Sequence, residues 1–149
     1  MTEAAVTIRP LEPTDREEWT ALWRAYLAFY ETERPAEVYD TTWERLMTAG
    51  EDPHGFCAVD GSGRLVGIVH YIFHRSCWTI GPYCYLQDLY ADPSVRGLGV
   101  GRALIEAVYA AADAQGASSV YWLTQEFNAT ARRLYDRIGK VTPFIKYTR

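Results

Sequence analysis

The segment from residue 85 to residue 108, YLQDLYADPSVRGLGVGRALIEAV, most constrains the fold, because it joins a strand to a helix through a glycine-rich turn. A strand-like run ends at Asp92-Pro93, and three alternating glycines follow it: Gly97, Gly99 and Gly101. Glycine lets a ligand approach bare backbone N–H groups, and the N-terminus of the following helix favours an anion. The segment therefore predicts an anion-binding turn at the start of a helix.

Hydrophobic periodicity along the rest of the chain predicts a mixed α/β sheet. Alternation with period two predicts strands at residues 6–9, 55–59, 65–73, 82–91, 119–124 and 144–147. Helical spacing predicts helices from a Thr14-Asp15 cap to about residue 31, from 41 or 42 to 47, from the glycine turn to about 116, and from an Asn128 cap to 139. Hairpins followed by alternating strands and helices indicate three layers, and the absence of a linker or repeat favours one domain over residues 1–149.

Composition narrows the class of protein. Fifteen basic and nineteen acidic residues give a net charge of −4 without a basic cluster, so we expect no nucleic-acid partner. No apolar run approaches about 18 residues, and the N-terminus lacks a signal-peptide core, so we expect no membrane span and a cytoplasmic location. Cys57, Cys77 and Cys84 form no C-x-x-C pair, which predicts buried free thiols, no disulfide framework and no metal site.

The glycine turn fits neither a P-loop nor a dinucleotide fingerprint, because no Lys-Ser or Lys-Thr follows it and Arg102 stands where the third fingerprint glycine belongs. It does fit the pattern [QR]-x-x-G-x-[GA], through Arg96, Gly99 and Gly101. With the later NATARRLYDRIG, the segment resembles the acetyl-coenzyme A (acetyl-CoA) loop of the GNAT superfamily of N-acetyltransferases. The hairpin followed by Trp78 resembles the branch that contains the diamine and polyamine acetyltransferases.

The resemblance spans roughly residues 55 to 147 and implies a three-layer α/β/α fold with a splayed central sheet, acetyl-CoA as cosubstrate, and a homodimer. It implies that successive N–H groups bind the pyrophosphate: those of Arg96, Gly97, Leu98, Gly99, Val100, Gly101 and Arg102. The strand before the turn is implied to carry a bulge and to offer its backbone to the pantetheine arm at Leu89, Tyr90 and Ala91. A tight connection without a ligand, with solvated arginines, is the alternative.

An aliphatic amine is mostly protonated at neutral pH, so acetyl transfer needs a base for the amine and an acid for the leaving thiolate. The resemblance implies that Tyr135, seven residues after Asn128, is this acid and contacts the coenzyme. It also implies that Asn128 contacts the coenzyme besides capping its helix. A buried tyrosine facing the sheet is the alternative for Tyr135.

The identity of the base is open. The polyamine branch tends to have a glutamate before the aspartate of this strand, whereas this chain has Gln87-Asp88, and an amide cannot accept the proton. Asp88 is the catalytic candidate, directly or through a water, with a structural carboxylate as the alternative. His74, Glu31 or a water chain could take this role instead, and His70 lies inside a strand pattern that predicts packing or hydrogen bonding.

The amine pocket is expected opposite the coenzyme, near the first long helix. Aromatic faces and carboxylates suit an ammonium group, and the substrate-binding candidates are Tyr26, Tyr30, Glu31, His74, Trp78 and Gln87. An ordinary acidic surface helix is the alternative. The expected function is acetyl transfer to a small-molecule primary amine such as a polyamine or amino acid. A protein lysine acetyltransferase and an acyl-CoA sensor or weakly active GNAT module are the alternatives.

Overall fold

The computed structural model describes residues 6–149; residues 1–5, where the segment considered for a signal peptide begins, lie outside it. The strands are β1 (Thr7–Pro10), β2 (His54–Val59), β3 (Leu65–His74), β4 (Tyr83–Ala91) and β5 (Ser119–Tyr121). The helices are α1 (Arg16–Phe29), α2 (Ala36–Leu46), α3 (Val100–Ala114) and α4 (Ala129–Ile138), with short 3-10 helices η1 (Pro13–Asp15) and η2 (Pro93–Val95). In the described chain, no helix is long and apolar enough to cross a membrane.

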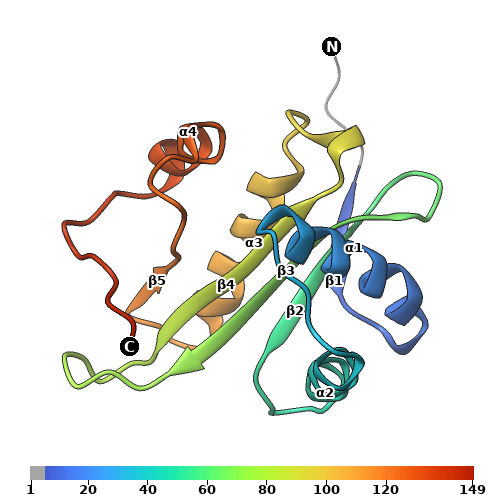
Figure 1. Ribbon diagram of the computed structural model, residues 1–149. Coiled ribbons are helices and arrows are strands. Elements are labelled where there is room, and N and C mark those ends of the chain that lie inside the picture. The colour runs from blue at the N-terminus through green and yellow to red at the C-terminus, as the bar shows by residue number, and fades with distance from the viewer. Residues whose placement is uncertain (1–5) are drawn as a thin grey trace.

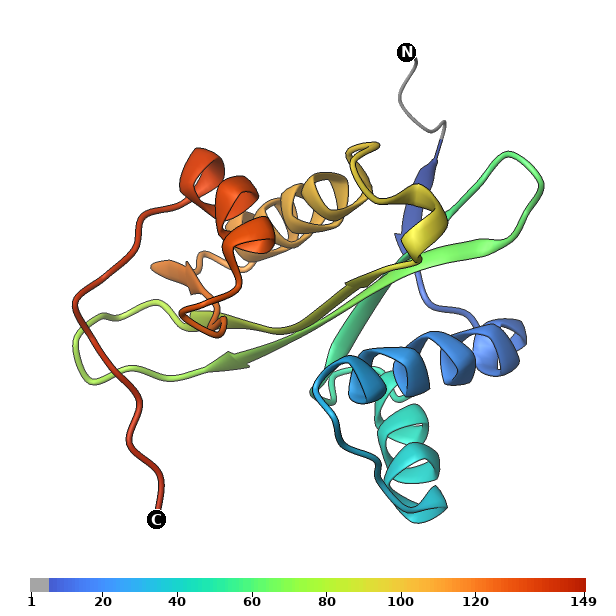
Figure 2. The same ribbon diagram turned by 45° about the horizontal axis from the view of Figure 1, so that its top comes forward.

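The strands form one open sheet in the order β1-β2-β3-β4-β5, and only the β4–β5 pair is parallel. Helices α1 and α2 lie on one face of the sheet, and α3 and α4 lie on the other (Figures 1 and 2). This arrangement confirms the predicted three-layer α/β fold with a mixed sheet. The hairpin turn at residues 60–63 is also confirmed, since Gly63 N–H donates to the Asp60 carbonyl.

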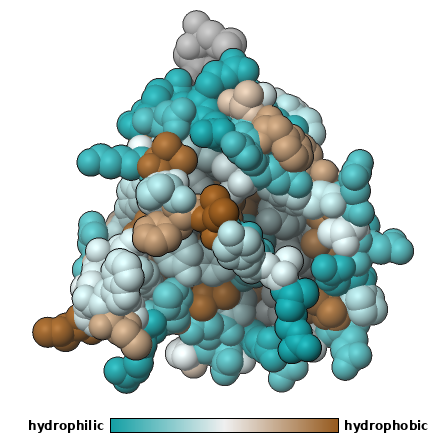
Figure 3. All heavy atoms as spheres, turned by 60° about the vertical axis from the view of Figure 1, so that its left-hand side comes forward, coloured by the Kyte–Doolittle hydropathy of each residue, from teal (hydrophilic) through white to brown (hydrophobic). Residues whose placement is uncertain are grey.

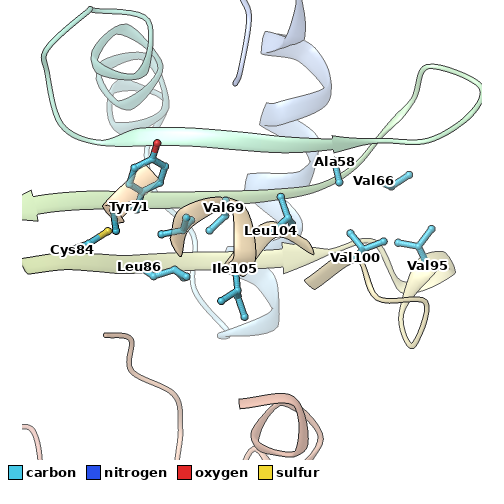
Figure 4. Packing of buried hydrophobic residues seen from close by; sticks show 12 residues of the cluster. Ala58, Val66, Val69, Tyr71, Cys84, Leu86, Val95, Val100, Leu104 and Ile105 are labelled. Atoms are coloured by element: carbon cyan, nitrogen blue, oxygen red, sulfur yellow. The ribbon is translucent and has the colours of Figure 1, made fainter. Parts of the chain in front are cut away.

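Two hydrophobic cores hold the layers together, one on each face of the sheet. On the α3 side, Leu104, Ile105 and Val108 are fully buried against strand residues such as Val69 (Figure 4). On the α1 side, Trp19, Trp23 and Trp43 pack together with β2 and β3 residues, among them Cys57 and Ile68. The aromatic stripe of α1 is therefore core at its N-terminal end, while Phe29 at its C-terminal end is exposed.

A bulge in β4 changes which face its side chains meet. His70 pairs with Asp88, but the next β3 residue, Tyr71, pairs with Leu86, so Gln87 is the extra residue. Leu86 before the bulge and Leu89 after it both pack toward α3. The bulge thereby turns the intervening Asp88 toward α1.

The sheet splays immediately before this bulge. Strands β4 and β5 pair only between residues 83–85 and 119–121, and the rest of β4 has no partner strand on that side within residues 6–149. The splayed central sheet implied by the family resemblance is thus confirmed. An unpaired strand side leaves backbone N–H and C=O groups open to an extended ligand.

Four local predictions were wrong. The expected strand at 144–147 is absent, because no neighbouring strand in the described chain supplies its hydrogen bonds, and β5 ends at Tyr121 rather than at 124 where the sheet splays. Helix α2 begins five residues early, at Ala36, because Pro35 starts the helix instead of only interrupting the chain. Cys77 is exposed in the β3–β4 loop, whereas Cys57 and Cys84 are buried.

The first helix begins directly after Asp15, as predicted, but the side chain of Asp15 does not cap it. Asp15 does not bond to a helical N–H of α1; its carboxylate accepts from the Arg9 guanidinium at 2.7 and 2.9 Å and from the Glu12 N–H at 2.7 Å. The Arg9 guanidinium lowers the pKa of Asp15, with the Glu12 N–H adding to the effect. Asp15 therefore fixes the connection between β1 and α1.

Candidate active site

A small hollow lies where β4 and β5 separate. It is lined from all three layers by Tyr26, Tyr30, Leu86, Gln87, Leu89, Ile105, Trp122, Leu123 and Tyr135. Ligands of open α/β sheets commonly bind beyond the carboxyl ends of parallel strands, where such strands diverge. The structure therefore brings five of the sequence candidates to one place: Tyr26, Tyr30, Gln87, Leu89 and Tyr135.

The glycine turn connects η2 to α3 at the end of β4. Gly97 and Gly99 have φ angles of 80° and 85°, which residues with a side chain rarely adopt. Gly99 occupies the N-cap position of α3. A Cβ on Gly97 would meet no protein atom within 4 Å, so its backbone angle, not packing, requires glycine. Such a backbone exposes its N–H groups instead of covering them.

Five N–H groups of this turn are available to a ligand. Within residues 6–149, no hydrogen bond uses the N–H of Gly97, Gly99, Val100, Gly101 or Arg102, whereas Arg96 and Leu98 donate to Pro93 and Val95. Consecutive free N–H groups at a helix start form an anion site. This backbone fits a pyrophosphate, although Arg96 and Leu98 contribute no free N–H to it.

The side chains of the two arginines are placed differently. The Arg96 Nε donates to the Ala91 carbonyl at 3.2 Å, and its guanidinium lies 5.4 Å from the Tyr90 ring centre. Arg102 pairs with Glu106 at 2.9 Å on the exposed face of α3. Arg96 thus contacts Tyr90 and Ala91 at the end of β4, two of the three residues expected to meet the pantetheine arm. Arg102 forms a surface ion pair.

Asp88 lies at the centre of a buried polar group on the α1 side of the sheet. Its Oδ2 is 3.0 Å from His70 Nδ1, and His70 Nε2 accepts from Trp19 Nε1 at 3.0 Å. The prediction that His70 is packed and hydrogen-bonded is confirmed, because it is only 1% exposed. Asp88 does not line the hollow itself.

Three tyrosines surround the Asp88 carboxylate. Burial and then the Asp88 charge raise the pKa values of Tyr26, Tyr30 and Tyr85. Tyr26 and Tyr30 also line the hollow, so they stand between it and Asp88. Proton transfer from a molecule in the hollow to Asp88 would therefore pass a tyrosine hydroxyl or a water.

Tyr135 faces the hollow from α4. Burial raises its pKa to about 12. Its ring packs edge-on against the Trp122 ring, with 5.5 Å between the ring centres. A phenol with this raised pKa keeps its proton at neutral pH and can donate it in a hydrogen bond to the leaving thiolate. Asn128, at the start of the same helix, accepts from the Ala131 N–H at 3.3 Å and so caps α4 as predicted, but it does not line the hollow.

Three candidates lie away from the hollow. His74 is at the far end of β3, about 13 Å along the strand from His70 by strand geometry, and it contacts the Tyr121 hydroxyl and the Arg75 carbonyl, each at 2.8 Å. Trp78 is 80% exposed in the β3–β4 loop. Glu31 lies on the surface after α1, in a shallow recess.

Sequence reasoning missed several lining residues, chiefly Trp122 and Leu123 after β5. Their position directly beyond a strand parallel to β4 was a usable signal, because that crevice is where such sheets bind ligands. No sequence signal identified the contact between Trp19 and His70, which are 51 residues apart. In the described chain, no group of three or more His, Cys, Asp or Glu side chains is placed to hold a metal ion.

Comparisons with known proteins agree on the family and the fold. The profile of the acetyltransferase (GNAT) family matches residues 19–139. The chain is 36% identical to the D-amino-acid N-acetyltransferase of Saccharomyces cerevisiae, over 100% of this chain and 93% of that protein. It is 33% identical to the thialysine N-epsilon-acetyltransferase of Sus scrofa, over 63% of this chain and only 51% of that longer protein.

Two solved structures share the fold at lower identity. The ribosomal-protein-alanine N-acetyltransferase from Brucella melitensis superposes with a TM-score of 0.81 at 23% identity, covering 97% of this chain and 98% of that one. An aminoglycoside N-acetyltransferase in complex with CoA superposes with a TM-score of 0.82 at 20% identity, covering 98% and 95%.

Proposed function

We propose, from the premise that this chain belongs to the GNAT family of acetyltransferases, that it transfers an acetyl group from acetyl-CoA to the primary amine of a small molecule by direct attack in a ternary complex. The observation that carries the proposal is the splay of the sheet, which leaves one side of β4 open between the hollow lined by Leu89 and Tyr135 and the turn with free N–H groups at the end of the strand. Each part supplies one requirement of the reaction.

The cosubstrate site consists of the turn and the open side of β4. Acetyl-CoA supplies an acetyl group activated as a thioester. The free N–H groups of residues 97 and 99–102 bind its pyrophosphate, and the unpaired backbone of Leu89 is available to its peptide-like arm, whereas the backbone of Tyr90 faces β3. The Ala91 carbonyl is already held by Arg96, so the pairing ends there.

The amine loses a proton toward Asp88. Tyr26 and Tyr30 lie between this carboxylate and the hollow, and their ring faces and hydroxyls suit an ammonium group. Gln87 lines the hollow at the bulge and can hydrogen-bond the amine without accepting its proton. Asp88 therefore acts as base through a tyrosine hydroxyl or a water.

Tyr135 protonates the leaving sulfur. Its hydroxyl stays protonated at neutral pH because burial raises its pKa to about 12. It lines the hollow from the opposite layer to Tyr26, so the acid and the base approach the reacting atoms from different sides. Asn128 supports this tyrosine by starting α4 at a fixed position.

The proposed acceptors are small amines. The relatives named above include proteins that carry D-amino acids and thialysine in their names, and one structural neighbour is named for aminoglycosides. A panel of D-amino acids, thialysine, a diamine and an aminoglycoside, with a lysine peptide as the macromolecular comparison, tests this. Release of free thiol and the mass of the acetylated product identify the acceptor, and release with the peptide alone would contradict a small-molecule substrate.

An acyl-CoA sensor is the second candidate, because Gln87 replaces the glutamate typical of the polyamine branch. Release of free thiol separates the two, and Asp88→Asn then tests the base. If Asp88 is the base, turnover falls far more at neutral than at high pH, where more of the amine is already neutral. Binding of acetyl-CoA without thiol release with any acceptor would favour the sensor.

A homodimer is part of the proposal. Apolar side chains after α4 are exposed: Phe144, Ile145 and Tyr147 are 77%, 76% and 88% exposed. Figure 3 shows brown side chains among teal ones on the side of the molecule that carries α4 and β5. Exposed groups of this kind are often covered by a second copy. A single domain over residues 1–149 and a cytoplasmic location stay predictions.

A further inference from the structure

We infer that Trp19 and His70 form a positioning pair that fixes His70 as one neutral tautomer and thereby holds the Asp88 carboxylate in place. This inference deepens the proposed function, since it explains how the chain controls the base of that same site. It rests on hydrogen bonds among three buried side chains, which are 0%, 1% and 9% exposed.

The tautomer follows from the donors and acceptors. An indole N–H can only donate, so the Trp19 Nε1 at 3.0 Å requires an unprotonated His70 Nε2. The proton of a neutral ring is then on Nδ1, which donates to Asp88 Oδ2 at 3.0 Å. A second proton on His70 would leave the two N–H groups of Trp19 and His70 facing each other in a buried place.

Trp19 therefore keeps the proton that the amine gives up on Asp88 and not on His70. If the ring could accept a proton at Nε2, the imidazolium would form beside the carboxylate, and the charge would be shared between them. With Nε2 occupied, His70 remains a neutral donor that holds Asp88 Oδ2. The proton taken from the amine thus stays on the carboxyl group.

No charged side chain other than Asp88 takes part in this group. The titratable groups that face Asp88 are Tyr26 and Tyr30 from α1, Tyr85 from β4 and His70 from β3. Three of these are phenols whose pKa values are raised, so they stay neutral at neutral and acidic pH. A change in the titration of Asp88 therefore reports on His70.

The tautomer is tested by nitrogen NMR of the full chain labelled with 15N-histidine, without substrate. The His70 signals are assigned by their loss in His70→Asn. The expected result at about pH 7 is one protonated nitrogen, Nδ1, and one unprotonated nitrogen, Nε2. A proton on Nε2, or on both nitrogens, would overturn the inference.

The role of Trp19 is tested with a matched pair of core variants. Trp19→Phe removes the indole N–H that His70 accepts, whereas Trp43→Phe removes an indole 5.0 Å away in the same cluster and leaves that bond intact. His70 should take a second proton at higher pH in Trp19→Phe than in Trp43→Phe. If His70 takes its second proton at the same pH in the two variants, Trp19 does not fix the tautomer. If either variant fails to fold, the tautomer measured in the wild type tests the inference instead.

The hold on Asp88 is tested by its carboxyl 13C shift. His70→Phe removes the N–H donor, so the Asp88 titration midpoint should rise by about one pH unit, the equivalent of a roughly tenfold change in proton affinity. His70→Asn retains an N–H near the Nδ1 position and should restore most of the wild-type midpoint. Equal midpoints in the wild type and His70→Phe would overturn the positioning role.

Kinetics separate this inference from the proposed function. The acid limb of kcat/KM should move with the Asp88 midpoint, which a purely structural role of His70 would not cause. A shifted midpoint with an unmoved acid limb would keep the His70–Asp88 link and reject Asp88 as the base. An unshifted midpoint rejects the link itself, whatever the activity.

Discussion

Gly99→Glu tests the anion site most directly. Gly99 has φ 85° at the N-cap of α3, and free N–H groups surround it. The glutamate would place a negative charge near the proposed pyrophosphate position. At about 5 Å and an effective dielectric constant of about 20, two like unit charges repel by roughly 3 kcal/mol, which weakens binding about 100-fold.

The substitution also strains the backbone, so it needs a control with the same strain. A side chain in the left-handed region costs about 1–2 kcal/mol, and the midpoint of thermal unfolding should fall by a few degrees. Gly63 has φ 88° in the β2–β3 hairpin, and a Cβ there would meet no atom within 4 Å. Gly63→Glu therefore introduces the same charge and a similar strain outside the turn.

Isothermal titration calorimetry with coenzyme A measures the effect. We expect Gly63→Glu to bind like the wild type and Gly99→Glu to lose about 100-fold in affinity, while thermal unfolding shows similar losses of stability in both. Equal affinity in the two folded variants would refute the placement of the coenzyme on this turn.

Three further predictions concern the acid, stability and assembly. Tyr135→Phe should lower kcat about 10²-fold or more while calorimetry shows unchanged coenzyme affinity; unchanged kcat in a chemistry-limited assay would exclude this acid. Because pairing with Arg9 lowers the pKa of Asp15, the stability from this pair is present at neutral pH and is lost as the pH falls below about 4. Urea midpoints should therefore fall less on acidification in Asp15→Asn than in the wild type, and an equal fall would contradict this. Light scattering at micromolar concentration should give about twice 17.0 kDa, and a mass of 17.0 kDa would remove the dimer.

Features that depend on neighbouring residues were predictable from the sequence. The strand, glycine turn and helix at residues 83–114 follow from local alternation, backbone freedom and helical periodicity. The Asn128 cap and the hairpin at Asp60 are likewise short-range, since each is a hydrogen bond between residues three apart in the sequence. The family resemblance rests on these same segments, which explains why the fold class could be predicted.

Features that depend on pairing between distant segments were decided by the tertiary structure. The bulge at Gln87 appears only in the register against β3, and it alone determines that Asp88 faces His70 and α1. The same reason explains the failures: a strand at residues 144–147 needs a neighbour that alternation cannot supply, and His74 follows β3 away from the hollow. Trp19, His70 and Asp88 meet across 51 and 18 residues because two helices and a bulged sheet bury them together, and no local pattern encodes that contact.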